Sequence, residues 1–201
     1  MAELDVDDVE SFTNGRLVAS DPEVGRMLAS ALRMARRYCG WSVTPIVTDF
    51  AVTLDGPGSK ILTLPTRKMV ELTSITEDDT ALDLADLRWS AGGPPGLLER
   101  PVSVRKKSRA WWKSYYQCID VVMTHGYTEE EAVDWRYAVL SMVDQMGQTL
   151  VTGRGELDMV SKKVDDVTYR WADPYATAAD SALYAMNNVF DDYRLPSVEF
   201  L

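Results

Sequence analysis

The sequence predicts an α+β fold in which helices pack around a small antiparallel β-sheet, followed by an extended C-terminal arm and a final helix. Apolar residues repeat at helical spacing in two stretches, Asp21–Tyr38 and Glu129–Leu150. Between them, Val43–Tyr127 alternates polar and apolar residues and has turn-forming residues every few positions, as short antiparallel strands do. Hydrophobic residues are 46% and charged residues 26% of the 201 residues, so the composition is that of a globular chain.

Two helices are expected before the strands. The first is short, lies within Leu4–Gly15, and has three apolar contact residues: Val6, Val9 and Phe12. The second, Asp21–Tyr38, can be capped by Ser20 or Asp21, with Glu23 completing a capping box from Ser20. Its buried stripe comprises Val24, Met27, Leu28, Ala31, Leu32, Ala35 and Tyr38.

The strands follow in order. The first is expected where Phe50, Val52 and Leu54 alternate with polar residues, and Asp55–Ser59 forms the next turn. Ile61–Leu64 then resumes as a short strand.

A third strand, Val70–Ile75, has an alternation that slips between Leu72 and Ile75, which indicates a bulge or a strand covered on both faces. Glu77–Thr80 is expected to turn it into a strand at Leu82–Leu84. Further strand candidates are Leu87–Trp89, Leu97–Leu98 and Ile119–Met123.

The third helix, Glu129–Leu150, begins after Thr128, whose hydroxyl can cap it, with acids at the positive end of the helix dipole. Its main stripe comprises Ala132, Trp135, Val139, Met142, Val143, Met146 and Leu150. Val133, Tyr137 and Leu140 lie on its other side, so burial on two sides is expected.

Beyond this helix, Val164–Trp171 is expected to be a strand or an extended arm, and Ala178–Tyr193 a last helix that Pro196 stops. The sequence therefore predicts a core domain over residues 1–150 and a C-terminal arm and helix over residues 151–201.

Charge is distributed unevenly along the chain, whose net charge is −10. Residues 1–23 hold seven acids and one base, whereas Arg100–Lys113 holds six bases and no acid. An acidic chain is not expected to bind nucleic acid generally, since phosphate attraction needs a basic surface. The chain has only two cysteines and its start lacks the basic and apolar regions of a leader, which favours synthesis in a reducing cytoplasm. No apolar run comes near the ~18 residues of a membrane span, so no membrane association is expected.

Residues that could carry chemistry do not form a catalytic or metal-binding set. His125 is the only histidine and is expected to pack or bond locally, and Cys39, at a helix end, is expected to pack. Adjacent acids such as Asp78-Asp79 are more typical of solvated turns than of cation sites. Gly92–Gly96 lacks the lysine of a phosphate-binding loop. We therefore expect no enzyme activity, metal or cofactor.

The basic segment Arg100–Lys113 is expected to be a long hairpin arm or loop that reaches away from the body. Four aromatic residues lie at its far end: Trp111, Trp112, Tyr115 and Tyr116. The segment could be a solvated hairpin anchored by these aromatics, a contact for the acidic surface of another protein, or a single-strand binder that uses charge and stacking.

The order of short motifs resembles that of the head-to-tail adaptor (connector) proteins of long-tailed bacteriophages, especially those of actinobacteria. The motifs are Arg36–Trp41, Thr44-Pro45, Leu54–Gly58, Leu64–Thr66, Val70–Ile75, Trp111-Trp112, Met123–Tyr127 and the acid-capped helix after it. The likeness covers about Val9–Leu150 and continues loosely through Val164–Pro196.

The resemblance implies a virion protein that forms a twelvefold ring between the portal protein and the next (stopper) ring of the neck, with DNA passing through its lumen without specific binding. It also implies that the C-terminal region engages the portal. Leu195–Leu201 is expected to dock there, because an apolar chain end after Pro196 suits a partner groove; the alternative is that Phe200 folds back onto its own subunit. The residues expected to contact partners are Arg105, Lys106, Lys107, Arg109, Trp111, Trp112, Tyr169, Trp171, Tyr193, Leu195, Phe200 and Leu201.

Three other functions stay open. A neck stopper or tail-completion protein would also form a ring, and the helix-first order favours the adaptor over it. A small metal-dependent hydrolase would have to use one of the acid pairs. A single-strand binder would use Arg100–Tyr116 and lose affinity steeply with salt.

Overall fold

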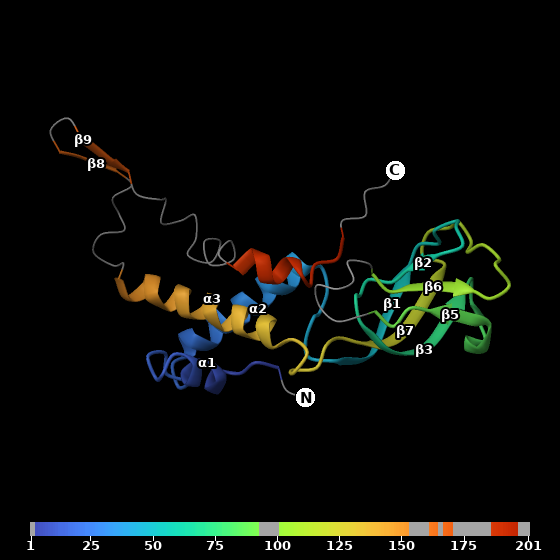
Figure 1. Cartoon of the computed structure of the whole chain (residues 1–201), viewed down its shortest axis with the longest axis horizontal. Helices are drawn as coiled ribbons and strands as arrows, with labels where there is room; N and C mark the ends of the chain where they lie inside the picture. Colours follow the sequence, from blue (N-terminus) through green and yellow to red (C-terminus); the bar gives the residue numbers. More distant parts are fainter. Residues whose placement is uncertain (1–2, 93–100, 153–160, 165–166, 171–185, 197–201) are drawn as a thin grey trace. The chain divides into compact units, whose positions relative to one another are not determined.

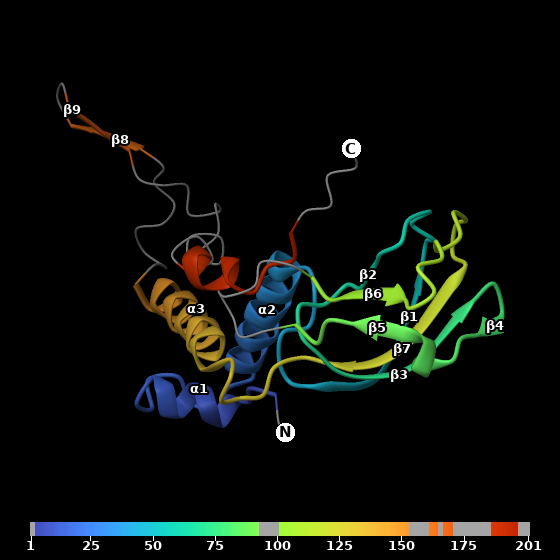
Figure 2. The same cartoon turned by 45° about the vertical axis from the view of Figure 1, so that its right-hand side comes forward.

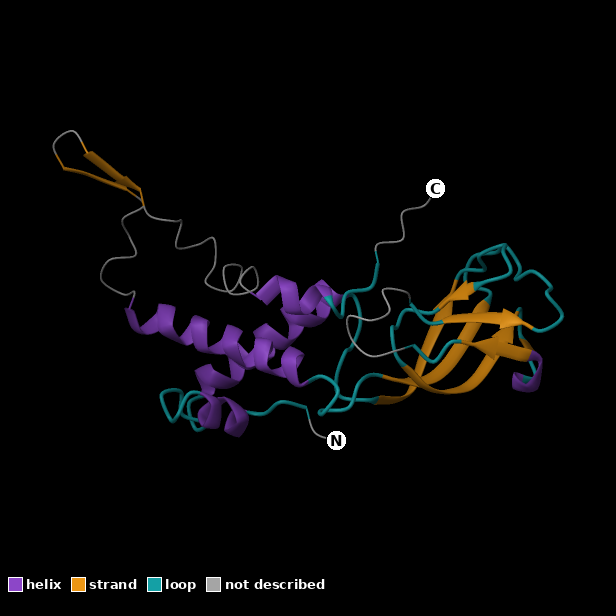
Figure 3. Ribbon diagram, viewed as in Figure 1, coloured by secondary structure: helices purple, strands orange, loops and turns teal. Residues whose placement is uncertain are grey.

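The computed structural model describes residues 3–92, 101–152, 161–164, 167–170 and 186–196. The chain divides into two compact units (Figures 1 and 3). The β unit comprises residues 39–133 and 192–201, and the helical unit comprises residues 2–38 and 134–191. The mixed α+β class that the sequence predicts, with a small antiparallel sheet and a C-terminal helix, is confirmed. In the parts of the chain that are described, no helix has the length and apolar character needed to span a bilayer.

The helical unit begins with the predicted short helix. Helix α1, Val6–Phe12, starts at Asp5, whose carboxylate accepts the backbone N–H groups of Asp7 and Asp8 in a capping box. Its inner face buries Val9.

Helix α2, Pro22–Cys39, matches the predicted range closely. Asp21 caps it, because its carboxylate accepts the N–H of Glu23 at 2.9 Å. The predicted stripe is buried at Val24, Met27, Leu28, Ala31, Leu32 and Ala35.

Helix α3, Val133–Thr152, begins later than the expected Glu129, because residues 129–132 form a turn. The Thr128 hydroxyl accepts the N–H of Glu131 at 3.2 Å, and the Glu131 carboxylate accepts the N–H of Thr128 at 3.1 Å. The predicted capping is therefore present one turn before the helix.

Only one side of α3 is deeply buried. Trp135, Val139, Met142, Val143 and Met146 are buried as predicted. The expected burial of a second side is wrong for Val133 and Tyr137, which are 61% and 60% exposed. The Tyr137 ring packs against the Phe12 ring of α1 in a T-shaped arrangement, with centroids 5.2 Å apart.

The C-terminal helix is described at residues 186–191, and the first part of the predicted Ala178–Tyr193 helix lies outside the described residues. Phe190 is buried and packs against Tyr38 and Trp135, with centroids 6.2 Å and 6.3 Å away. The hydroxyl of Tyr38 also donates a hydrogen bond to the Asp191 carboxylate at 2.7 Å.

The β unit has two antiparallel sheets (Figures 1 and 2). The first has the order β1-β7-β3-β4 and the second the order β2-β6-β5. The first sheet is made of β1 Val47–Leu54, β7 Ile119–His125, β3 Met69–Glu77 and β4 Thr80–Ala81. The second sheet is made of β2 Leu62–Thr63, β6 Ser103–Lys106 and β5 Leu87–Trp89.

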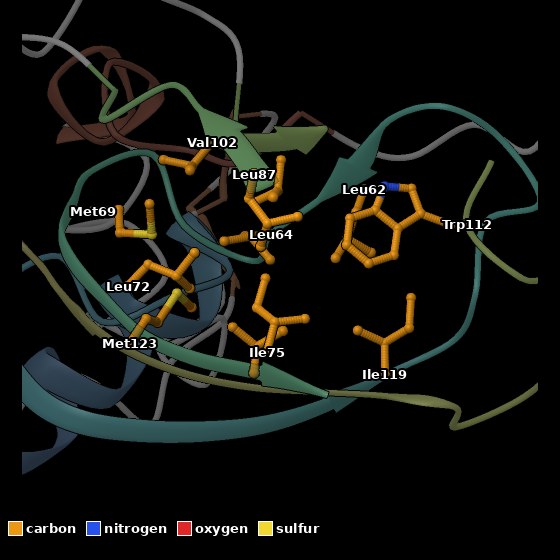
Figure 4. Close-up of a cluster of buried hydrophobic side chains, with 12 residues drawn as sticks. Leu62, Leu64, Met69, Leu72, Ile75, Leu87, Val102, Trp112, Ile119 and Met123 are labelled. Atoms are coloured by element: carbon orange, nitrogen blue, oxygen red, sulfur yellow. The ribbon is translucent and has the colours of Figure 1, made fainter. Parts of the chain in front are cut away.

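Both sheets contribute side chains to one hydrophobic core (Figure 4). The first sheet supplies Met69, Leu72, Ile75, Ile119, Val121 and Met123, and the second supplies Leu62, Leu87 and Val104. Trp112 joins them from the loop after β6 and is 1% exposed. Each fully buried side chain of this size contributes roughly 1.5–3 kcal/mol, so this core stabilises the β unit.

Local irregularities of the strands were partly predictable. The register shift between Leu72 and Ser74 confirms the bulge expected from the slipped alternation. The β3–β4 turn has positive φ at Asp78 and Asp79, the geometry of a tight two-residue hairpin turn.

The expected strand at Leu82–Leu84 is wrong. Strand β4 is Thr80–Ala81, and Leu84–Asp86 forms a 3₁₀ turn instead. The carboxylate of Asp83 accepts the N–H of Ala85 at 2.8 Å and so caps this turn. The Leu97–Leu98 candidate lies outside the described residues.

The expected arm after α3 contains an antiparallel hairpin of β8, Ser161–Val164, and β9, Val167–Arg170. Trp171, the end of the predicted range, lies outside the described residues.

The basic segment is not an arm that reaches away from the body. Its residues Ser103–Lys106 form β6, the central strand of the second sheet, paired with both β2 and β5. Val102 and Val104 alternate with polar residues along the chain, so their side chains lie on the core-facing side of the sheet and are buried.

Candidate interaction surfaces

Lys106 and Trp112, two of the residues expected to contact partners, serve the fold instead. The Lys106 amine lies 2.6 Å from the Glu77 carboxylate and 4.5 Å from the centroid of the Trp112 ring. Burial alone would raise the pKa of Glu77, but hydrogen bonds from the Lys106 amine and the Lys113 backbone hold that pKa below its ordinary value. With Trp112 in the core and Lys106 paired with a buried acid, neither side chain is available as a surface contact.

Other cations of the basic segment stay at the surface. The Lys107 amine donates to the carbonyl of Ala85, and Arg109 is exposed at a position with φ of 58°. The Lys113 amine donates to the Asp78 carboxylate at 2.6 Å, which raises the pKa of Lys113. Arg105 is exposed on β6, directly opposite Arg88 of β5.

Exposed aromatic side chains lie on a structured loop at one end of the β unit. Trp111 is 63% and Tyr116 is 89% exposed, and Tyr115 is similarly accessible. Their loop is joined to the loop after β1, because Gly56 donates its N–H to the carbonyl of Tyr115 at 2.7 Å. At Gly56 an added Cβ would lie 2.1 Å from the carbonyl oxygen of Lys113, so the close approach of the two loops requires glycine.

The C-terminal residues Tyr193 and Leu195 are anchored within the β unit. Tyr193 is fully buried, and its ring meets that of Tyr127 edge-on with centroids 5.5 Å apart. The carbonyl of Tyr193 accepts the indole N–H of Trp41 at 2.7 Å. Leu195 donates its N–H to the carbonyl of Cys39 at 2.8 Å. Tyr193 therefore packs within its own subunit.

Arg67 completes the anchor, and sequence reasoning missed it. The Arg67 side chain is buried, and its guanidinium donates to the carbonyls of Asp192 and Arg194. The guanidinium thus binds two backbone carbonyls of the irregular segment that follows the C-terminal helix. No spacing in the sequence connects Arg67 with residues 192–194, so this contact could only be found in three dimensions.

The remaining predicted contact residues are not tested by side-chain geometry. Tyr169 lies on β9, opposite Lys162, and Trp171, Phe200 and Leu201 lie outside the described residues.

His125 packs in an aromatic cluster. It is 2% exposed and lies between Trp41 and Phe50, with ring centroids 5.9 Å and 4.7 Å away. Neither ring nitrogen has a hydrogen-bond partner among the described residues. Burial lowers the pKa of His125 to about 4, so the ring is neutral at pH 7. A neutral, enclosed ring packed between Trp41 and Phe50 has the packing role expected from the sequence.

The other candidate groups are dispersed. Cys39 is buried, and Cys118 is partly buried. Across the described ranges, histidines, cysteines and acids do not gather in groups of three or more that could hold a metal ion. Beside α1 there is an open surface hollow of about 450 Å³, lined by Asp7, Glu10, Ser11, Asn14 and Gly15.

Comparisons with known proteins give one informative result. No family model and no curated protein matches the sequence. Among solved structures, the chain is similar to a chain of the structure described as the neck of a native GTA (gene transfer agent) particle computed with C12 symmetry. The two are 13% identical and superpose with a TM-score of 0.55 over 100% of this chain and 96% of the other. This chain thus has a fold similar to that of a chain from the neck of this particle.

Proposed function

We propose that this chain is a structural virion protein, a head-to-tail adaptor whose ring joins the capsid portal to the next ring of the neck and lets DNA pass through its lumen. The observation that carries this proposal is the full-length similarity in fold to a chain of a particle neck. The adaptor-like order of motifs along the sequence points to the same place in a virion.

The ring is twelvefold in this proposal. The similar chain belongs to a structure computed with C12 symmetry. Neighbours in a closed ring meet through two different surfaces of each subunit, which allows acidic and basic surfaces of identical chains to pair. The uneven charge distribution of this chain suits such contacts.

The net charge of −10 fits a DNA conduit. A lumen wall that repels phosphate lets the duplex slide, whereas a basic wall would hold it through counterion release. The chain is therefore proposed to act without catalysis and without specific nucleic-acid binding.

The C-terminal tail is proposed to engage the portal, with one refinement. Leu195 is bonded to Cys39, and Arg67 holds the carbonyls just before it. The segment offered to the portal therefore begins after Pro196 rather than at Leu195. The arm over residues 151–185 is proposed to contact neighbouring molecules.

Removing the gene from its own phage or phage-like element tests the proposal. We expect DNA-filled heads and separate tails, and we expect the purified protein added in trans to restore joined particles. Cryo-electron microscopy of the joined particles should show a twelvefold ring of this fold in contact with the portal. Normal joining without the protein would contradict the proposal.

The position of the ring separates the adaptor from the neck stopper. A ring that touches the tail and lies one layer away from the portal would identify a stopper or tail-completion protein. For the single-strand alternative, the exposed Trp111, Tyr115 and Tyr116 are the relevant groups. That function predicts binding to an oligonucleotide that weakens steeply with salt, and fluorescence anisotropy would measure it.

A further inference from the structure

Two arginines lie side by side on the outward face of the second sheet. Arg88 of β5 and Arg105 of β6 are directly opposite in the antiparallel register. Their chain neighbours Leu87 and Val104 are buried in the core, so both arginines point away from it. Opposite residues on one face of a sheet have Cβ atoms roughly 4.5–5.5 Å apart, so the two positive charges are close.

The two arginines have no counter-charge among the described residues of their own subunit. Among the described residues, neither guanidinium takes part in an ion pair or hydrogen bond, whereas Lys68, Lys106 and Lys113 are each paired with an acid. Like charges directly opposite on a sheet destabilise it. A chain with 31 acids and 21 bases could readily supply a carboxylate here, so the pair serves something other than folding of the subunit.

The surroundings of the pair suit a carboxylate. Thr63 of β2 pairs with Ser103 of β6 on the same face, one step along the sheet from Arg105. The Ser90 hydroxyl accepts the N–H of Ser103 at 3.1 Å beside Arg88. Two guanidinium forks flanked by hydroxyl groups can bind carboxylates in the bidentate manner that makes such pairs strong.

We propose that Arg88 and Arg105 bind acidic side chains of the neighbouring copy of this chain, and that the α1 region of that copy supplies them. This inference rests on the proposed function, because it assigns one of the two different surfaces through which identical subunits close a ring.

The α1 region is complementary to the arginine pair in charge. Asp7 and Glu10 line the open hollow beside α1, which has room for projecting side chains. The Glu10 carboxylate already accepts the backbone N–H of Ala19 at 2.6 Å, so Asp7 is the acid that a partner can reach. Asp7 makes no ion pair among the described residues, whereas Asp8 pairs with Arg136 and Glu3 pairs with Arg36. Among the described residues, the chain therefore has an unpaired acid, Asp7, at the hollow and an unpaired pair of arginines on the outward face of the second sheet.

A DNA phosphate is the other occupant with suitable chemistry, and the charges of the chain argue against it. The whole chain carries a net charge of −10, and the exposed acids Asp83 and Asp86 precede β5 directly. Phosphate binding gains most of its affinity from many cations acting together. Two arginines on an acidic protein match a small number of carboxylates better.

Cysteine cross-linking in assembled particles tests the contact without removing either charge. Thr63→Cys lies beside the arginine pair and Ser11→Cys lies in the acidic hollow, both on exposed residues. With Cys118→Ser as background and a short bis-maleimide reagent, the double variant should give a ladder of covalent multimers. Each single variant is the matched control and should give no ladder.

Charge removal tests whether the contact matters. Arg88→Gln/Arg105→Gln should leave a folded subunit and lower the yield of joined particles by about tenfold or more, because paired interface charges set the lifetime of a complex. The matched control is Arg33→Gln/Arg37→Gln, which removes the same charge from exposed residues of α2 and should join normally. Asp7→Asn should reproduce the loss.

The outcomes separate this inference from the proposed function. If the wild-type ring is present in the neck but the double-cysteine chain gives no ladder, the inference fails and the proposed function stands. If the glutamine variant joins particles at the wild-type yield, the inference also fails. Normal rings with altered DNA release would assign the arginines to phosphate and overturn it. Absence of the wild-type chain from the neck would overturn both.

Discussion

Consecutive cations of one strand have different roles at the scale of single residues. Arg105, Lys106 and Lys107 look alike in the sequence, yet only Lys106 neutralises the buried Glu77. Side chains of a strand point alternately to its two faces, and the burial of Val102 and Val104 shows which face is turned to the core. The sequence therefore locates the basic segment but does not show which of its charges are available to a partner.

His125 should make the stability of the β unit depend on pH. Its pKa is about 4 in the folded chain and about 6.5 when unfolded, so the unfolded state binds the proton first. The stability that the neutral ring confers is complete above pH 6.5 and is lost as the pH falls toward 4. We expect a loss of about 2 kcal/mol between pH 7.5 and pH 5, measured by urea unfolding.

The matched control is His125→Phe, which keeps an aromatic ring between Trp41 and Phe50 and has no proton to bind. Between pH 7.5 and pH 5, the loss of stability of this variant should be smaller than that of the wild type by about 2 kcal/mol. An equal pH dependence in both proteins would contradict this prediction, because it would show that the folded chain binds the His125 proton as readily as the unfolded chain does.

Arg88→Gln should stabilise the isolated subunit slightly. Removing one charge relieves the repulsion across the β5–β6 pair, and cross-strand pairs are worth roughly 0.2–1 kcal/mol. Thermal unfolding at low and high salt measures the effect, which should shrink as salt screens the charges. A loss of stability would show that Arg88 has a favourable partner within the subunit.

At the scale of elements, the two long helices depend on one buried face each. Leu28→Asp in α2 or Val139→Asp in α3 should lower the free energy of unfolding by several kcal/mol, because each places an unpaired charge among buried apolar side chains. Ser30→Asp, on an exposed position of α2, is the control and should stay within about 0.5 kcal/mol of the wild type in circular-dichroism melts. Leu28→Asp as stable as Ser30→Asp would contradict the assigned face.

Element types were easier to predict than their partners. The caps at Asp21 and Thr128 and the bulge after Leu72 follow from patterns within a few residues, so the sequence contains them. The separation of the strands into two sheets depends on which strands pair, and a period of two carries no information on pairing. For that reason the sequence pattern predicts an arm where β6 lies, although Val102 and Val104 alternate with polar residues as a strand does.

At the scale of the whole molecule, each unit is built from separate parts of the chain. The β unit takes residues 192–201 as well as 39–133, and Tyr193 fills a place in it beside Tyr127. A division of the sequence at residue 150 can separate contiguous segments only. Residues 192–201, which return to the β unit, are recognisable by their contacts rather than by their composition.

The C-terminal tail should be dispensable for folding and required for attachment. Deleting residues 197–201 should leave the Tm within about 1 °C, because the deletion leaves the buried Tyr193 and the Leu195 hydrogen bond in place. Attachment to portal-bearing heads, measured by co-sedimentation, should be abolished.

The control is Tyr193→Ala, which should lower stability by roughly 3 kcal/mol through loss of a buried aromatic ring. A tail-deleted chain that still attaches to heads would contradict the proposed portal contact, and one that unfolds would show that the tail belongs to the fold.

The anchor at residues 192–195 also determines where a mechanical load would enter the protein. If the tail is held by a portal while DNA pressure strains the neck, tension along the chain reaches Leu195 first. The Leu195–Cys39 hydrogen bond and the guanidinium of Arg67 then pass this tension directly to the β unit. The helix at residues 186–191 lies behind this clamp, so it is shielded from unwinding until the clamp breaks.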